Sequence, residues 1–94
     1  SDEVYRIFEK DPNNFFPSYD TVLSCVHPKD LKMVEQEFLK SIIERIPFNI
    51  THRIISKSRG NKYVNEKTET VYGASGEPLI SYGTVMDITD IYTV

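Results

Sequence analysis

The chain has 94 residues, which is enough for one domain and too short for two. Its composition, with 39% hydrophobic and 27% charged residues, is typical of a folded globular protein and argues against a disordered segment. The formal net charge of -3 provides no basic surface for nucleic acid or anionic lipid, and no apolar run reaches the length of a membrane span.

The first third of the chain is predicted to form two short helices. The first lies within residues 1–10 and ends at the turn-forming proline and asparagines of residues 11–14. Ser18 can cap the second helix, because its hydroxyl group can accept a hydrogen bond from an unpaired amide of the first turn. The apolar positions are Val4, Ile7 and Phe8 in the first helix, and Tyr19, Val22, Leu23 and Val26 in the second.

The strongest periodic pattern predicts a long helix from Pro28 to about Glu44. Apolar residues recur every three or four positions, and the opposite face is charged. Pro28 suits the first turn of a helix, where no amide hydrogen is required, and Pro47 ends the pattern. The apolar positions are Leu31, Val34, Phe38, Leu39, Ile42, Ile43 and Ile46.

After Pro47 the apolar period changes to two, which predicts β-strands. The expected strands span residues 48–57, 62–72 and 79–88, with turns at residues 58–61 and 73–77. Gly60 can adopt the positive φ that a tight hairpin turn needs. Helices followed by two successive hairpins predict an α+β fold, in which the helices cover one face of an antiparallel sheet.

The order of these elements and several short motifs resemble those of PAS domains, a family of sensory and interaction domains. The motifs are Val4-Tyr5-Arg6-Ile7-Phe8 with Pro12, Phe16-Pro17-Ser18-Tyr19, Val26-His27-Pro28-Lys29-Asp30, Tyr63-Val64, Gly76-Glu77-Pro78 and Gly83-Thr84-Val85-Met86-Asp87-Ile88-Thr89. The resemblance covers nearly the whole chain. It implies that the family's first two strands would precede Ser1, so we expect residues 1–94 to be a single, N-terminally truncated domain.

The resemblance implies a sensory domain in a larger two-component or cyclic-dinucleotide signalling protein, which relays a signal to an output domain such as a histidine kinase. The alternative is a ligand-free interaction and dimerisation module of the same fold. We expect no enzymatic activity in this chain, because it has no phosphate-binding loop, nucleophile elbow or kinase motif. The lone Cys25 is consistent with a cytoplasmic location, and we expect no contact with nucleic acid or membrane.

A small apolar cavity between helices and sheet is a further implication of the resemblance. Its candidate lining residues are Phe38 and Ile42 on the long helix and Ile54 and Tyr82 on the strands. The flavin-binding subfamily has an Asn-Cys-Arg-Phe stretch and the haem-binding subfamilies usually have a histidine on the long helix, and this chain has neither. We therefore predict no haem or flavin and leave an unknown small ligand open.

The histidines and the cysteine do not form a metal-binding pattern. Two histidines and one cysteine without close spacing give no zinc site. His27 precedes the long helix and either caps it or coordinates a ligand. His52 alternates with apolar residues and is either a structural histidine or a cavity residue. Cys25 is expected to be a small apolar residue at a helix end.

The closing Asp87-Ile88-Thr89 resembles the motif that connects PAS domains to a downstream helix. By this resemblance, Asp87 anchors the end of the last strand through a cation or a backbone amide, with Lys67 and Arg53 as candidate cations. Thr89 begins the exit path. An ordinary strand end with a polar cap is the alternative. The outgoing helix or interface strip would begin with Ile88, Ile91, Tyr92 and Val94.

A three-stranded meander would leave one strand edge unpaired. Unpaired edges present free amide and carbonyl groups, which another chain can pair with. We therefore expect the chain to form a homodimer or a higher assembly through strand-edge pairing.

Overall fold

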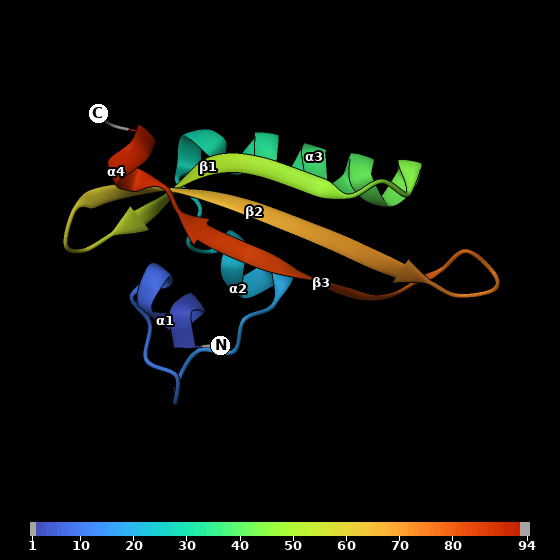
Figure 1. Cartoon of the computed structure of the whole chain (residues 1–94), viewed down its shortest axis with the longest axis horizontal. Helices are drawn as coiled ribbons and strands as arrows, with labels where there is room; N and C mark the ends of the chain where they lie inside the picture. The colour runs from blue at the N-terminus through green and yellow to red at the C-terminus, as the bar shows by residue number, and fades with distance from the viewer. Residues whose placement is uncertain (1, 93–94) are drawn as a thin grey trace.

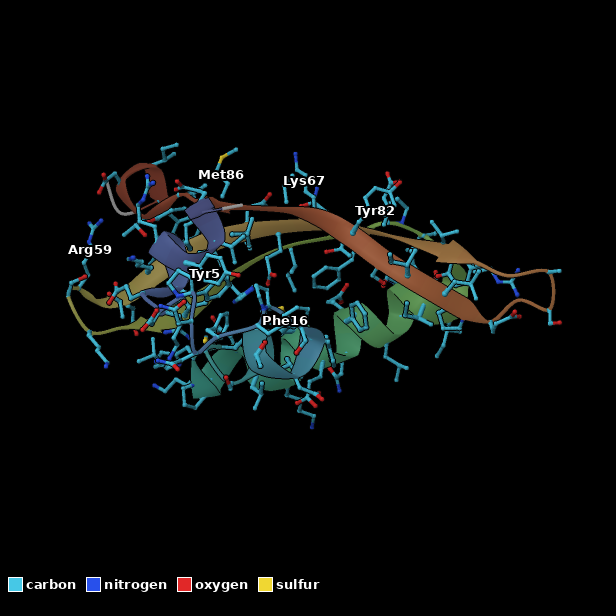
Figure 2. The ribbon with its side chains drawn as sticks, turned by 90° about the horizontal axis from the view of Figure 1, so that it is seen from below. Tyr5, Phe16, Arg59, Lys67, Tyr82 and Met86 are labelled. Atoms are coloured by element: carbon cyan, nitrogen blue, oxygen red, sulfur yellow. The ribbon has the colours of Figure 1, made fainter. Side chains whose placement is uncertain are left out.

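The computed structural model describes residues 2–92, apart from the side chain of Asp2, as helices packed against a sheet (Figure 1). In chain order the elements are α1 (Asp2–Phe8), α2 (Tyr19–Leu23), α3 (Pro28–Glu44), β1 (Phe48–Ser56), β2 (Gly60–Tyr72), β3 (Pro78–Asp87) and α4 (Thr89–Tyr92). The strands form an antiparallel sheet of order β1-β2-β3. Viewed along the sheet edge, α2 and α3 lie on one face (Figure 2), and α1 contributes Ile7 and Phe8 to the buried cluster on that face. The predicted α+β fold is therefore confirmed.

Local capping explains why the helices begin where the sequence predicted. The Ser18 hydroxyl accepts a hydrogen bond from the Thr21 amide at 3.3 Å, and the Thr21 hydroxyl accepts one from the Ser18 amide at 2.8 Å. At the start of α3, Nδ1 of His27 accepts a hydrogen bond from the Lys29 amide at 3.0 Å, and Pro28 occupies the first turn. These side chains satisfy amides that have no partner within the helix.

The register of the sheet decides which side chains face the helices. His52 pairs with Val64 and Glu69 pairs with Tyr82. Because side chains alternate along a strand, His52 and Val64 lie on the inner face, while Glu69 and Tyr82 lie on the outer face. Lys67, Tyr82 and Met86 extend from the outer face (Figure 2). Gly60 has a φ of 77°, as the predicted turn requires.

The core lies between the inner face and the helices, in two clusters of buried residues. One consists of Ile7, Phe8, Cys25, Ile54 and Val64, and the other of Val26, Val34, Phe48 and Ile50. The segment between α2 and α3 also covers the free edge of β1, because the amide of Ile55 donates to the Cys25 carbonyl at 2.9 Å. The expectation that Cys25 is a small apolar residue at a helix end agrees with this position.

The predicted apolar stripe of α3 is only partly buried. Leu39, Ile43 and Ile46 are 58%, 70% and 46% exposed. The helix instead turns Val34 and Ser41 toward the sheet, and the Ser41 hydroxyl donates to the carbonyl of Phe38 at 2.7 Å. A helix packed against one edge of a narrow sheet buries a narrow stripe, so the remaining apolar residues stay outside it.

Two features of the molecule concern its surface. β3 is one of the two edge strands of the sheet, and its residues are exposed along nearly its whole length, although Val85 is half-buried. Within residues 2–92, none of the helices has the length and apolar character needed to cross a membrane.

Candidate functional site: a pocket between the helices and the sheet

A pocket of about 320 Å³ lies between the helices and the inner face of β2 and β3. A pocket of this size can accommodate a small molecule of one or two rings. Its helical wall is mainly apolar, and its strand wall combines Phe48 with mostly short or polar residues. The helices contribute Val4 and Phe8, Val22 and Leu23, and Val34 and Phe38, while the strands contribute Phe48, Glu66, Thr68 and residues 81–85.

Aromatic rings form one side of the pocket. The ring of Phe38 stacks on Tyr19 at a centroid distance of 4.4 Å and meets the edge of Phe48 at 5.7 Å. Burial raises the pKa of Tyr19, and the nearby charges of Glu35 and Asp20 raise it further, so the phenol stays neutral at physiological pH. This side therefore offers flat apolar surfaces and an uncharged hydroxyl group.

Among the described side chains that line the pocket, Glu66 is the charged one, and the buried His52 contacts its carboxylate. The His52 side chain is completely buried, and its Nε2 contacts Oε2 of Glu66. Its Nδ1 lies 3.1 Å from the carbonyl oxygen of Arg53. Both partners can accept a hydrogen bond, and this geometry favours the protonated ring, in which both nitrogens donate.

The pKa of His52 agrees with this geometry. Burial lowers the pKa, but the hydrogen bond and the negative charge of Glu66 outweigh burial, and the pKa lies above its ordinary value. His52 is thus a buried structural histidine, as one of the two sequence hypotheses stated. The Glu66 partner was missed, although the register gave a signal: a turn centred near Ser58 places Glu66 diagonally across from His52 on the same face.

The structure places only part of the predicted cavity lining at the pocket. Phe38 lines the pocket with its ring. Tyr82 borders the pocket as part of β3, but its hydroxyl donates to Glu69 at 3.2 Å on the outer face. Ile54 is fully buried in the core, and Ile42 lies beyond the pocket near the end of α3, so neither lines it. Core and cavity residues have the same apolar pattern in a sequence, which explains the error.

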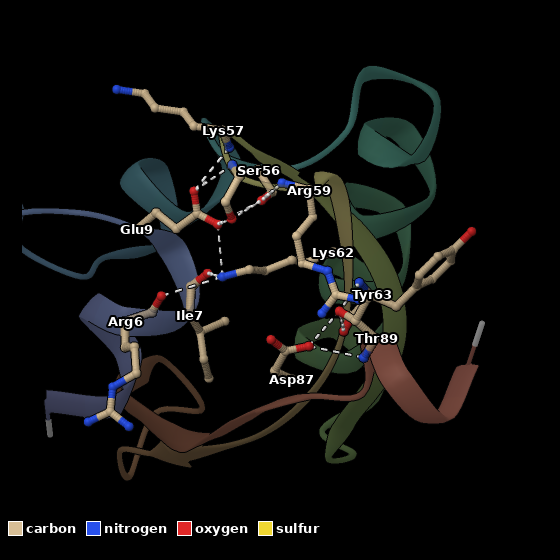
Figure 3. Close-up of polar contacts among 11 residues, drawn as sticks. Arg6, Ile7, Glu9, Ser56, Lys57, Arg59, Lys62, Tyr63, Asp87 and Thr89 are labelled. Atoms are coloured by element: carbon tan, nitrogen blue, oxygen red, sulfur yellow. Dashed lines mark hydrogen bonds and ion pairs between the residues drawn. The ribbon is translucent and has the colours of Figure 1, made fainter. Parts of the chain in front are cut away.

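A second polar group of interest is the carboxylate of Asp87 at the end of β3. Its Oδ1 accepts hydrogen bonds from the amide of Thr89 at 3.0 Å and from the hydroxyl of Thr89 at 2.5 Å (Figure 3). The Thr89 hydroxyl also accepts a hydrogen bond from the Tyr63 amide at 3.0 Å. Burial raises the pKa of Asp87, but the hydrogen bonds from Thr89 outweigh it, and the pKa lies below its ordinary value.

The two cations that the sequence offered as partners of Asp87 are wrong. The guanidinium of Arg53 binds Asp30 instead, with an Nη2–Oδ1 distance of 2.7 Å. Lys67 pairs with Thr84 and lies on the outer face, whereas Asp87 pairs with Val64 on the inner face. The backbone amide of Thr89 takes the role of the anchor.

α4 is attached to the sheet mainly through Tyr63. The ring of Tyr92 stacks on Tyr63 at a centroid distance of 4.3 Å, and the amide of Ile88 donates to the Tyr63 carbonyl at 2.9 Å. The structure therefore places Ile88 and Tyr92 at a helix that leaves β3, while Ile91 is 77% exposed and Val94 lies outside the described residues. From the sequence, Tyr63 was identified only as part of a motif, and its stacking contact with Tyr92 was not predicted.

A third polar cluster joins α1 to the β1–β2 hairpin. The carboxylate of Glu9 accepts hydrogen bonds from the hydroxyls of Ser56 at 2.6 Å and Ser58 at 2.9 Å, and it lies 2.9 Å from Nζ of Lys62 (Figure 3). Lys62 also donates to the carbonyl of Ile7 at 3.0 Å. The hydrogen bond from Ser56, followed by that from Lys62, lowers the pKa of Glu9 to about 2.

Comparison with known proteins identifies the arrangement. A family model described as the PAS fold matches residues 1–85. The structure is similar to that of a sensory box histidine kinase/response regulator from Burkholderia thailandensis, with a TM-score of 0.83 and 18% identity over 99% of this chain and 69% of that chain. It is also similar to the N-terminal domain of a diguanylate cyclase with PAS/PAC sensor from Marinobacter aquaeolei, with a TM-score of 0.81 and 16% identity over 96% of this chain and 82% of that chain. No curated protein matches significantly.

Proposed function

This chain belongs to the PAS fold family, and from this premise we propose that it is the sensory domain of a larger signalling protein of the histidine kinase or cyclic-dinucleotide synthase type. One observation carries the proposal: the pocket and the exit helix share the same strand. Residues 81–85 of β3 form a wall of the pocket, and Asp87 at the end of β3 holds Thr89 at the start of α4. The two similar structures come from a histidine kinase/response regulator and a diguanylate cyclase, which supports this class.

The proposed mechanism passes from the pocket to α4 through β3. A molecule in the pocket contacts residues 81–85 and favours one arrangement of β3 over another. Asp87 and the Thr89–Tyr63 hydrogen bonds then transmit that arrangement to α4 and to the output domain beyond it. The signal is only as large as the difference in the ligand's affinity for the two arrangements.

The chain itself is proposed to have no catalytic activity and to bind neither haem nor flavin. The carboxylates of α3, which are Glu35, Glu37 and Glu44, are exposed to solvent, and acid–base catalysis needs groups placed in a cleft. Cys25 is buried in the core cluster and is outside the pocket lining, which argues against a role as a reactive thiol toward a bound ligand. The parent protein would supply the enzymatic domain in the cytoplasm.

Native mass spectrometry of the purified chain tests the proposal. We expect an added mass of a few hundred daltons per chain, roughly what a ligand that fills the pocket would weigh. The added mass should disappear when the chain is denatured, because the contacts are noncovalent. A bare chain mass would count against a retained ligand and would favour the alternative, an interaction module without a sensing role.

A further inference from the structure

Among the side chains that the structure describes, Glu66 is the only carboxylate in the wall of the pocket. Among the described residues that line it, none is a lysine, arginine or histidine, and most are apolar. A bound anion would therefore meet the Glu66 carboxylate, and no cation lines the described wall of the pocket beside it. Anionic ligands are disfavoured on this ground, because an unpaired buried charge is costly.

The two oxygens of Glu66 are in different situations. Oε2 is occupied by Nε2 of His52, and the Glu66 side chain is 14% exposed. Oε1 has no hydrogen-bond partner within residues 2–92. No fully buried side-chain oxygen or nitrogen in that part of the chain lacks a partner, so Oε1 must reach open space. Glu66 lines the pocket, so the pocket is open space within reach of its carboxylate.

The chemistry of Oε1 sets the kind of group that can face it. A carboxylate oxygen accepts hydrogen bonds and cannot donate them, so the ligand must supply an N–H or O–H group. The adjacent His52 imidazolium balances the charge of Glu66, which reduces the attraction for a cation. A neutral donor on an apolar body matches both the acceptor and the aromatic side formed by Phe38 and Phe48.

We propose that the pocket selects a small, uncharged, largely apolar molecule that donates an N–H or O–H hydrogen bond to Oε1 of Glu66. The inference rests on the proposed function, which makes the pocket a ligand site. His52 acts as a positioning residue, because its contact with Oε2 fixes the carboxylate and directs Oε1 toward the ligand.

Indole and benzofuran are suitable probes, because the two molecules have nearly the same shape and only indole has an N–H group. Each is titrated into the ¹⁵N-labelled chain, and the amide shifts of pocket residues such as Val85 and Phe38 give the site and the Kd. We expect indole to bind about tenfold more tightly, which is the effect of one hydrogen bond to a charged acceptor. This comparison requires no mutation, so it does not depend on the stability of a variant.

A double variant, His52→Leu with Glu66→Leu, tests whether Glu66 causes the preference. Both polar partners are removed together, so no buried group is left unpaired. We expect the ratio of the two Kd values to fall to about one. Glu69→Gln is the matched control, because Glu69 lies on the same strand but on the outer face, and it should leave the ratio unchanged.

The outcomes separate this inference from the proposed function. Equal affinities of indole and benzofuran for the unaltered chain, or a preference that persists in the double variant, would overturn the role of Glu66 and leave the pocket as a ligand site. If neither probe shifts any pocket amide at millimolar concentration, the ligand site and the role of Glu66 both fall.

Discussion

At the scale of single residues, Asp87 connects the end of β3 to the start of α4 through two hydrogen bonds to Thr89. The Asp87→Ala variant removes the oxygen that accepts both hydrogen bonds without opening the core, because Asp87 is exposed. In the full-length protein we expect altered signal output, while the chain stays folded and loses about 1 kcal/mol of stability. Output assays and thermal unfolding measure the two effects.

Asp87→Asn is the matched control for this change. The asparagine side chain keeps an oxygen that can accept from the Thr89 amide, so its output should lie closer to that of the unaltered protein. An Asp87→Ala protein with unchanged output would remove Asp87 from the signalling path.

Glu9 predicts a specific dependence of stability on pH. Its pKa of about 2 in the folded chain lies below its ordinary value of 4.5. A carboxylate whose pKa is lowered by folding stabilises the fold above the unfolded pKa, and this contribution is lost as the pH falls through the folded pKa. The contribution of Glu9 is therefore complete above pH 4.5 and disappears between pH 4.5 and about pH 2.

The Glu9→Gln variant measures this contribution. It removes the negative charge of the carboxylate that accepts a hydrogen bond from Ser56 and forms an ion pair with Lys62. We expect a loss of about 1–3 kcal/mol in the free energy of unfolding at pH 7. The difference from the unaltered chain should shrink toward zero as the pH falls to 2. Urea unfolding at several pH values tests this, and a difference that is independent of pH would contradict the assignment.

At the scale of the elements, the sequence predicted the helices and strands well because their boundaries are set locally. Ser18 and Pro28 lie at helix starts and Gly60 at a hairpin turn, and each acts through its own backbone or side chain within a few residues. Which side of α3 packs against the sheet could not be predicted from local signals in the same way. Its apolar residues surround much of the helix, and only the position of β1 decides that Val34 and Ser41 are buried while Ile43 is not.

The candidate site was less predictable than the fold, because its polar contacts join residues that are distant in the chain. The elements α2, α3 and β1 all lie between Glu9 and Lys62 in the chain, and no local pattern relates the two residues. Asp30 and Arg53 likewise meet only after α3 has packed along β1. The Glu66–His52 pair is the exception, since the hairpin turn fixes which residues of two neighbouring strands face each other.

One aromatic contact attaches the end of α4 to the sheet. Tyr92→Ala removes the ring that stacks on Tyr63, so we expect α4 to detach from the sheet. The stability loss should be small, about 1 kcal/mol, because α4 has four residues and adds little to the core. Hydrogen exchange of the Tyr92 amide, which donates to the Ile88 carbonyl, reports the detachment.

Ile91→Ala is the matched control for Tyr92→Ala. Ile91 is the preceding residue of α4 and is 77% exposed, so its truncation should leave exchange at residue 92 unchanged. Equal protection of α4 in both variants would show that the Tyr63–Tyr92 stack does not hold the helix.

At the scale of the whole molecule, the two edges of the sheet differ. The edge of β1 is covered by the segment between α2 and α3, through hydrogen bonds such as that from the His27 amide to the Arg53 carbonyl at 3.0 Å. Within residues 2–92, the outer edge of β3 has no neighbouring strand. Its outer face also exposes Ile80, Tyr82 and Met86 by 61%, 57% and 60%. An uncovered edge beside an apolar face favours pairing with another chain.

We therefore predict that the chain forms a dimer through β3, and that Thr84→Lys weakens it. Thr84 is exposed on β3, and a lysine there places a charge at the pairing edge, where it would be desolvated in the dimer. Because it costs free energy to remove the lysine ammonium group from water, we expect the dimer Kd to increase roughly tenfold or more. Light scattering during size-exclusion chromatography over a range of concentrations measures this Kd.

The control for Thr84→Lys lies on β1, the strand at the other edge of the sheet. Asn49 is exposed on β1, so Asn49→Lys adds the same charge away from the proposed interface and should leave the Kd unchanged. A monodisperse monomer at high concentration would rule out self-association through β3. Equal weakening by both lysines would indicate a general effect of charge, because a contact specific to the β3 edge responds only to the lysine placed on that edge.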